Sequence, residues 1–499
     1  MSKDAYAKLV EKFQRLSRLE HAMTFLQWDQ LVMMPAAGND TRSKSIAELA
    51  SMHHEMLTEP EMGELIDTAQ GQVTEPSLQR SLLEMERTWR QAVCLPSTLV
   101  KAQSLAGSKC EHGWRTQRKE NDWKGFLSNF REVVNLSREE AQARQAVKPE
   151  RFPTPYDALL DLYCTGDSSE FIKKTFDQLK TTLPGLIEEV ISQQNETVSL
   201  RGSYPIDAQK QLNEKLMKVL GFNFEAGRLD VSMHPFSTGD TGDQRITTRF
   251  RDTDFADALQ GTAHETGHAS YEAGLPEEWA DLPVGNARNM CLHESQSLLF
   301  EKQIFLSSPF TQFFAQSVHS YLPDAKRFSA EEIWHASKRV QPSLIRVEAD
   351  EVTYPLHVIL RFEIESSLMN STLEPDDIPE LWDEKMKKYM GLSTKDNYAD
   401  GCLQDIHWTD GSFGYFPSYT LGALNSAQLF AAIKKEHPEW QEKLAQGDIG
   451  FIRNWLQKAI WSKASTLDSQ DIIIQATGEG TNPGYFLEHI QARYLRNQY

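Results

Sequence analysis

Residues 254–274 read DFADALQGTAHETGHASYEAG, and this stretch decides how the surrounding region folds. Its apolar residues recur at the spacing of one helical face: Phe255, Ala258, Leu259 and Thr262. Asp254 is a residue type that caps helix N-termini, and Gly274, with Pro276 soon after it, is a typical helix stop. The stretch therefore predicts one helix between Asp254 and Gly274.

The centre of this predicted helix carries the pattern H-E-x-x-H at residues 264–268. Because residues i and i+4 lie one above the other on a helix, His264 and His268 can bind one Zn²⁺ through their imidazole nitrogens. Glu265 is then placed to take a proton from a metal-bound water. The pattern predicts a zinc-dependent hydrolase, and the alternative is two surface histidines on an ordinary helix.

A catalytic zinc site needs a third protein ligand and keeps one position open. The residues after His268 read ASYEAG and lack the G-x-x-H continuation, which favours a carboxylate from a second helix. Glu294, within His293-Glu294-Ser295-Gln296, begins such a helical run and is our first candidate. By spacing alone, three other carboxylates stay open as rivals: Glu272, Glu277 and Glu278.

Composition excludes several classes of protein. The chain has 499 residues, 52 Lys and Arg against 71 Asp and Glu, and a net charge of −19, so nucleic-acid partners and anionic membrane surfaces are not expected. No stretch is apolar enough for a membrane span or a signal peptide. The five cysteines are widely spaced, which indicates a reducing, cytoplasmic environment rather than a disulfide framework.

Most of the chain has helical periodicity. We expect a first helix that ends before Pro35, a second that begins near Asp40, and further helices to about residue 145. A proline cluster at residues 149–155 is a candidate linker. Two β-like runs, residues 228–232 and 244–250, flank a turn-rich centre and predict a hairpin with a long loop. The second run is a candidate exposed edge to which an extended peptide could add.

Several motifs together resemble those of the carboxypeptidase Taq family of zinc metallocarboxypeptidases. H-E-T-G-H is followed by H-E-S-Q at residues 293–296, and four further motifs occur in the family's order: His234-Pro235-Phe236, Asp243-Gln244-Arg245-Ile246-Thr247, Ile345-Arg346-Val347-Glu348-Ala349-Asp350, and Gly401-Cys402-Leu403-Gln404-Asp405-Ile406-His407-Trp408. These motifs span residues 234–408, and the N-terminal half adds none.

The resemblance implies a mainly α fold: a large helical body with a deep active-site groove and a small β hairpin or sheet beside a gluzincin-like H-E-x-x-H helix. We expect one domain over residues 1–499, with a helical N-terminal part at about 1–150 and a catalytic part at about 228–425. It further implies a homodimer that uses one Zn²⁺, or Co²⁺, per chain. His264, His268 and Glu294 would be the metal ligands and Glu265 the general base in releasing single residues from peptide C-termini.

A carboxypeptidase must recognise a free carboxylate, and arginine offers the matching donor fork. Arg346 is our first candidate and Arg245 the second. The alternative for each is a structural ion pair, with Asp350 and Asp243 as the respective partners. The candidates for oxyanion or substrate binding are His407, Tyr415, Tyr419 and His234. Asp243 and Asp405 are candidates for orienting histidines.

Two other functions stay open. A helical zinc oligoendopeptidase would use the same ligands but would not require a free C-terminus. A non-catalytic helical dimer could keep zinc as a structural element, although a structural site normally has a fourth protein ligand.

Overall fold

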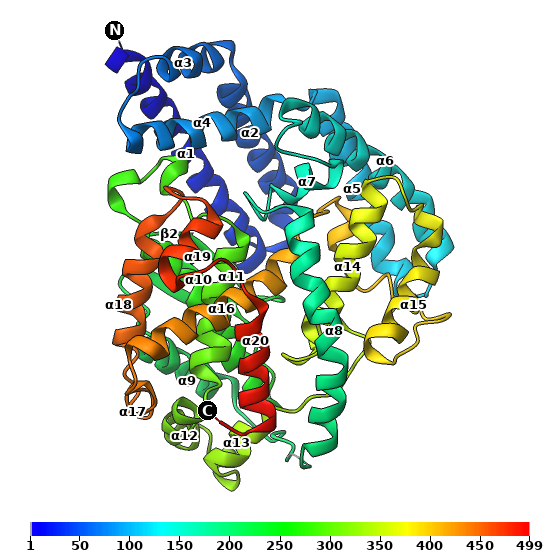
Figure 1. Cartoon of the computed structure of the whole chain (residues 1–499), viewed down its shortest axis with the longest axis vertical. Helices are drawn as coiled ribbons and strands as arrows, with labels where there is room; N and C mark the ends of the chain where they lie inside the picture. The colour runs from blue at the N-terminus through cyan, green and yellow to red at the C-terminus, as the bar shows by residue number, and fades with distance from the viewer. Residues whose placement is uncertain (1, 197, 499) are drawn as a thin grey trace.

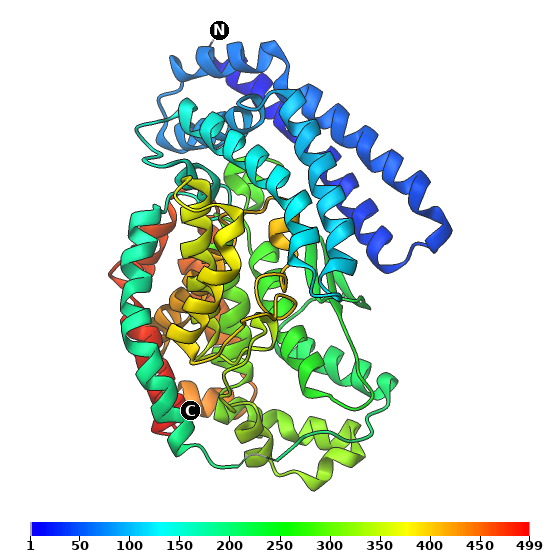
Figure 2. The same cartoon turned by 90° about the vertical axis from the view of Figure 1, so that its right-hand side faces the viewer.

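The computed structural model describes residues 2–196 and 198–498, and it is built mostly from helices (Figure 1). The first helices lie together at one end of the molecule: α1 (Ser2–Val32), α2 (Asn39–Thr58), α3 (Pro60–Gln70), α4 (Pro76–Val93), α5 (Ser97–Gln117) and α6 (Trp123–Val147). The predicted break at Pro35 is confirmed, because α1 ends at Val32 and α2 begins at Asn39. Figure 2 shows α1 and α2 projecting from the body as an antiparallel pair.

The helical body follows the proline cluster, which forms the loop between α6 and α7. Its helices are α7 (Pro155–Leu160), α8 (Ser169–Gln193), α9 (Ile206–Val219), α10 (Ala256–Ala273), α11 (Met290–Leu298), α12 (Ser308–Tyr321), α13 (Ala330–Ala336), α14 (Tyr354–Met369), α15 (Ile378–Met390), α16 (Pro417–Glu436), α17 (Trp440–Leu444), α18 (Gly450–Ala459), α19 (Ser469–Thr477) and α20 (Pro483–Ile490). Within the described residues, no helix combines the length and apolarity that crossing a bilayer would need.

The β region forms a three-stranded sheet, and its topology differs from the predicted hairpin. Strands β1 (Gly227–Val231) and β3 (Asp243–Thr248) pair in parallel, while β2 (Phe236–Asp240) pairs antiparallel with β3. The hairpin is therefore β2–β3, with a tight turn near Gly242. Since β3 lies between its two neighbours, the prediction that this run is an exposed edge is wrong.

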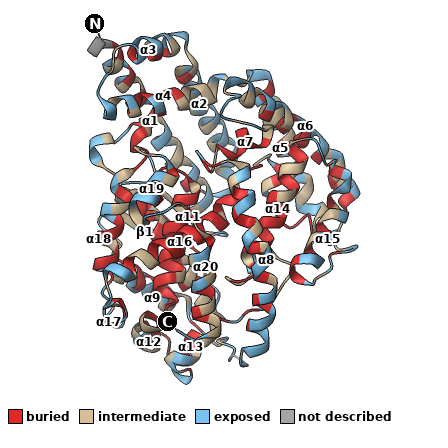
Figure 3. Ribbon diagram, viewed as in Figure 1, coloured by how far each residue is buried: buried red, intermediate tan, exposed pale blue. Residues whose placement is uncertain are grey.

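Helix α16 connects two large hydrophobic cores. Its residues Leu421 and Leu424 pack in a core with α6, α8, α14 and α15. Its residues Leu429 and Phe430 pack in a second core with α9, α10, α12 and α18. Helices α11 and α16 are accordingly among the most buried elements (Figure 3). Burial on all sides holds these helices, and the side chains they carry, in fixed positions.

Candidate active site

The predicted H-E-x-x-H helix is confirmed as α10. The carboxylate of Asp254 accepts hydrogen bonds from the backbone N–H groups of Ala256, at 2.8 Å, and Asp257, at 3.2 Å. The helix ends at Ala273, and the Gly274 N–H bonds the Ser270 carbonyl at 3.1 Å. The sequence therefore fixes both ends of α10, with the histidines well inside it.

Two glycines let neighbouring helices approach the centre of the site closely. A Cβ on Gly267 would lie 2.5 Å from the carbonyl oxygen of Gln296 on α11. A Cβ on Gly422 of α16 would lie 2.6 Å from the Cβ of Glu294. Since both distances are far below van der Waals contact, any larger residue would push α11 away. Glu294 is thus held between α10 and α16.

Three side chains converge into a possible metal site. Among the described residues, donor atoms of His264, His268 and Glu294 all lie within 4.8 Å of one another. The Glu294 carboxylate is 3.7 Å from Nε2 of His264 and 3.4 Å from Nε2 of His268. Two imidazoles and a carboxylate suit a divalent ion such as zinc. The three donors fit such an ion and leave a coordination position for water or substrate.

Further hydrogen bonds hold both histidines with Nε2 toward this cluster. Nδ1 of His264 lies 2.9 Å from the Glu301 carboxylate. Nδ1 of His268 lies 2.6 Å from Nδ1 of His293, whose Nε2 lies 2.7 Å from Glu272. Carboxylate partners of this kind orient metal-binding histidines and increase their basicity. Glu272, a rival for the third ligand, therefore acts on His293 instead.

Glu265 lies beside the cluster and is 7% exposed. Burial raises the pKa of its carboxyl to about 7, and the negative charge of Glu294 adds to this effect while His264 opposes it. A carboxylate with a pKa near the working pH can both accept and return a proton. Its position next to His264 is therefore chemically suited to acid–base work.

A cavity of about 310 Å³ opens from the cluster. The residues that line it include His264 and Glu294 of the cluster, together with Arg346, Tyr354 and Tyr419. A possible metal site and a buried cation thus face the same space, which is large enough for the end of a peptide.

Known proteins of similar sequence and fold are carboxypeptidases. The sequence model described as carboxypeptidase Taq (M32) metallopeptidase matches residues 8–494. The chain is 36% identical to thermostable carboxypeptidase 1 of Thermus thermophilus, with 98% of each chain covered, and 32% identical to carboxypeptidase 1 of Bacillus subtilis, with 97% of each covered. Metallocarboxypeptidase 1 of Trypanosoma cruzi superposes with a TM-score of 0.96 at 38% identity, covering 99% of this chain and 100% of that one.

The chain belongs to the carboxypeptidase Taq (M32) family. It is a metallocarboxypeptidase, a hydrolase that uses a divalent metal. The resemblance seen in the motifs and the expectation of a mainly α fold are both confirmed.

In this metallocarboxypeptidase, Arg346 is 5% exposed and is held from two sides. Its Nε and Nη2 donate to the Asp405 carboxylate at 3.1 and 2.8 Å, and its Nη1 donates to the Tyr354 hydroxyl at 2.7 Å. Arg361 also pairs with Asp405, at 2.5 Å. Two guanidinium groups therefore share one carboxylate, and this corner of the cavity keeps a net positive charge.

The ion-pair partners differ from two of our sequence predictions. Asp405 pairs with arginines, so the expectation that it orients a histidine is wrong. Asp350 does not pair with Arg346; its carboxylate instead accepts backbone N–H groups at the start of the next segment, including that of Thr353 at 2.9 Å.

The aromatic candidates form one group beside the cavity. Tyr419 lines the cavity, and its ring centre is 5.3 Å from that of Tyr415. The His407 ring is 5.5 Å from Tyr415. Burial, and then the charge of Arg346, lower the pKa of His407 to about 4, so it is a neutral imidazole near pH 7. The structure brings these three residues together, with Tyr419 nearest the cluster's cavity.

The structure does not bring the other two candidates to this cavity. Arg245 is paired with Asp243 at 2.6 and 2.9 Å, and its guanidinium lies over Trp28 of α1, 4.6 Å from the ring centre. The alternative of a structural ion pair thus fits Arg245. His234 is exposed on the loop between β1 and β2.

Sequence reasoning missed Glu301, His293 and Tyr354. Glu301 lies seven residues after Glu294, almost two helical turns, so both point to one side of their helix. That spacing is a usable signal. However, Glu301 lies in a π-helical segment, Leu299–Phe305, whose geometry the sequence did not indicate.

Proposed function

We propose that this chain removes single amino acids, with broad specificity, from peptides that have a free C-terminus. The proposal rests on one observation: His264 and Glu294, two members of the cluster that also contains His268, line the same cavity as Arg346. A carboxypeptidase needs a hydrolytic centre and a cation that binds the terminal carboxylate. The two must be separated by the length of one amino-acid residue. Tyr354 and Tyr419 restrict the space around that cation.

The metal ligands in this proposal are His264, His268 and Glu294, with zinc, or cobalt, as the ion and one ion per chain. When bound, the ion would supply Lewis-acid chemistry, lowering the pKa of a water and polarising the scissile carbonyl. Glu301 and the His293–Glu272 pair hold the two histidines in the tautomer that leaves Nε2 free for the ion.

Arg346 binds the terminal carboxylate of the peptide, because Asp405 neutralises only one of the two arginines that share it. This places the last peptide bond beside Glu265. Glu265 accepts a proton from the attacking water and returns it to the leaving amine. His407, Tyr415 and Tyr419 are the donors available to the developing oxyanion.

We also propose a homodimer, as the family resemblance implies, in the cytoplasm. The five free cysteines support the cytoplasm, because its reducing conditions keep thiols unpaired. Light scattering of the purified protein would test the dimer, and a mass of 56.9 kDa would contradict it.

The discriminating experiment compares an N-blocked dipeptide with its C-terminal amide, with and without chelator. We expect cleavage of the free acid only, abolished by the chelator. Equal cleavage of both substrates would instead support an oligoendopeptidase. No cleavage of either, with metal bound, would support a structural metal.

Two arginine variants sharpen this assay. Arg346→Ala should reduce kcat/KM for the free acid about 10- to 100-fold, the effect of losing a charged hydrogen-bond pair, while Asp405 keeps Arg361 as partner. Arg245→Ala is the matched control and should leave the preference for the free acid unchanged. If Arg245→Ala lost the preference for the free acid and Arg346→Ala kept it, Arg245 would be the residue that binds the terminal carboxylate of the peptide.

A further inference from the structure

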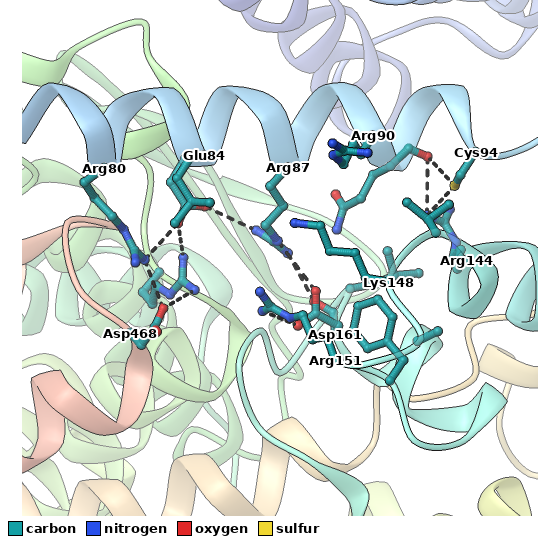
Figure 4. A pocket seen from close by; sticks show the side chains of 17 residues that line it. Arg80, Glu84, Arg87, Arg90, Cys94, Arg144, Lys148, Arg151, Asp161 and Asp468 are labelled. Carbon is teal, nitrogen blue, oxygen red and sulfur yellow. Dashed lines mark hydrogen bonds and ion pairs between the residues drawn. The ribbon is translucent and has the colours of Figure 1, made fainter. Parts of the chain in front are cut away.

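A second cavity, of about 100 Å³, lies between α4, the end of α6 and the loop that leads to α7 (Figure 4). It shares no lining residue with the metal cavity. Its cationic lining residues, which we call the arginine pocket, are Arg80, Arg87, Arg90, Arg144, Arg151, Arg288 and Lys148. Such a cluster is unexpected in a chain with a net charge of −19.

The carboxylates around the arginine pocket do not balance its positive charge. Its six arginines pair with only five carboxylates, which are Glu84, Glu86, Glu140, Asp161 and Asp468. Among the described residues, the Lys148 ammonium forms no side-chain hydrogen bond or ion pair, and in Figure 4 it extends across the cavity toward Arg87. Counting these seven cations and their five ion-pair partners, positive charges exceed negative charges by two. Asp167, near Arg288, does not cancel this excess fully, because burial raises its pKa to about 7.

Buried donors in the pocket also lack partners. Arg288 is 4% exposed and lines the cavity, yet its Nε has no hydrogen-bond partner. Nε of Arg87 also makes no hydrogen bond, although it lies 3.6 Å from the Asp161 carboxylate. Burial lowers the pKa of Arg288; Glu84 opposes this, and the nearby charges of Arg80 and Arg87 reinforce it. A buried donor without a partner is costly, so an acceptor inside the cavity would be stabilising.

Part of the cavity lining is apolar. The apolar residues that line the cavity are Leu83, Val147, Phe152 and Leu162. The volume is several times the roughly 10–15 Å³ that a single water needs on this measure. The space suits a small ion or the charged end of a small molecule better than one ordered water.

We propose that the arginine pocket binds a doubly charged oxyanion: phosphate, either as the free ion or as the phosphoryl group of a small metabolite. Two negative charges match the surplus of two positive charges. Tetrahedral oxyanions accept the paired N–H donors of guanidinium groups, and Lys148 adds a point charge. If the ligand is a phosphorylated metabolite, its organic part would contact the apolar residues of the cavity.

Such a ligand would connect segments that are far apart in the sequence. Arg87 and Arg90 lie on α4, Lys148 follows α6, and Arg288 lies just before α11, which carries Glu294. Because a ligand that binds only the folded state stabilises it, phosphate should strengthen the contact between the N-terminal helices and the catalytic body.

The test is thermal unfolding of the holoenzyme with increasing inorganic phosphate or phenyl phosphate, against chloride at matched ionic strength. We expect a rise in Tm of about 2 °C or more at saturation. Lys148→Glu removes the surplus and should abolish the rise. Lys124→Glu, an exposed lysine at the other end of α6, is the matched control and should keep it.

The two ligands distinguish the two sources. A larger rise with phenyl phosphate would identify an organic phosphate, and an equal rise would identify the free ion. No rise with either ligand would overturn the proposal. A rise that Lys148→Glu leaves unchanged would also overturn it, because phosphate would then bind elsewhere, for instance at the metal.

Discussion

The metal cavity and the arginine pocket are both charged, yet they are constructed in opposite ways. Around the metal cluster, each histidine has a hydrogen-bonded partner, and glycines on two helices fix the distances. In the arginine pocket, cations outnumber their carboxylate partners, and the buried Nε of Arg288 has no hydrogen-bond acceptor. In the first, every charged group has a fixed neighbour, whereas in the second the excess of cations leaves room for the anion proposed above.

The largest expected effect is in the metal cavity. Glu265→Gln keeps the shape of the side chain but removes its ability to accept a proton. We expect kcat to fall by about 10²- to 10⁴-fold while the bound metal, measured by mass spectrometry, stays at the wild-type level. A variant with near wild-type kcat would end the assignment of Glu265 as general base.

The next effect tests whether backbone spacing holds the metal ligands. In Gly422→Ala the new Cβ would lie 2.6 Å from Glu294 Cβ, so Glu294 must move. We expect metal affinity to fall about 10- to 100-fold, as when a supporting contact of a ligand is lost. Competition with a chelator of known affinity measures this.

Gly185→Ala in α8 is the matched control, because nothing lies within 4 Å of its Cβ. It should bind metal as the wild type does. If both glycine variants keep full affinity, α16 does not position Glu294.

A smaller effect concerns stability at the rim of the metal cavity. Burial would raise the pKa of Glu351, but His489 and Arg493 lower it to about 2. The unfolded state therefore binds the proton more tightly, and the stability from Glu351 is present above pH 4.5 and lost as the pH falls toward 2.

Glu351→Gln should thus be less stable than the wild type at pH 7, by up to about 3 kcal/mol. Urea unfolding at several pH values measures the difference, which should shrink as the pH falls from 4.5. A difference that is constant with pH would mean that the ion pair contributes nothing.

The smallest effect is expected in the arginine pocket. There, unlike at Glu351, removing a charged side chain should not lower the stability of the protein. Lys148→Ala removes a surplus cation rather than a partner. In phosphate-free buffer we expect the free energy of unfolding to stay within about 0.5 kcal/mol of the wild type, or to rise. A loss comparable to that of Glu351→Gln would show that Lys148 has a structural partner, and the two cavities would then be alike.

The sequence predicted the parts of the molecule that depend on local spacing. The i, i+4 histidines, the ends of α10 and the break at Pro35 all follow from a few consecutive residues. Glu294 could be proposed but not separated from Glu272 by spacing, because the choice depends on how α11 packs against α10 at Gly267.

Features that depend on tertiary packing could not be predicted. The parallel pairing of β1 with β3 requires β2 to pair on the far side of β3, which two separate β-like runs do not reveal. The partner of Arg346 is Asp405, 59 residues away, rather than the nearby Asp350. The arginine pocket joins residues from Arg80 to Arg288, and its excess of cations exists only in the folded chain.

The most direct test of the central claim is to titrate the chelator-treated protein with zinc while following release of the last amino acid from a peptide. We expect no activity without metal, and a linear rise that stops at one zinc per chain. Activity in metal-free protein, or a rise that continues to two zinc ions per chain, would contradict a single centre formed by His264, His268 and Glu294.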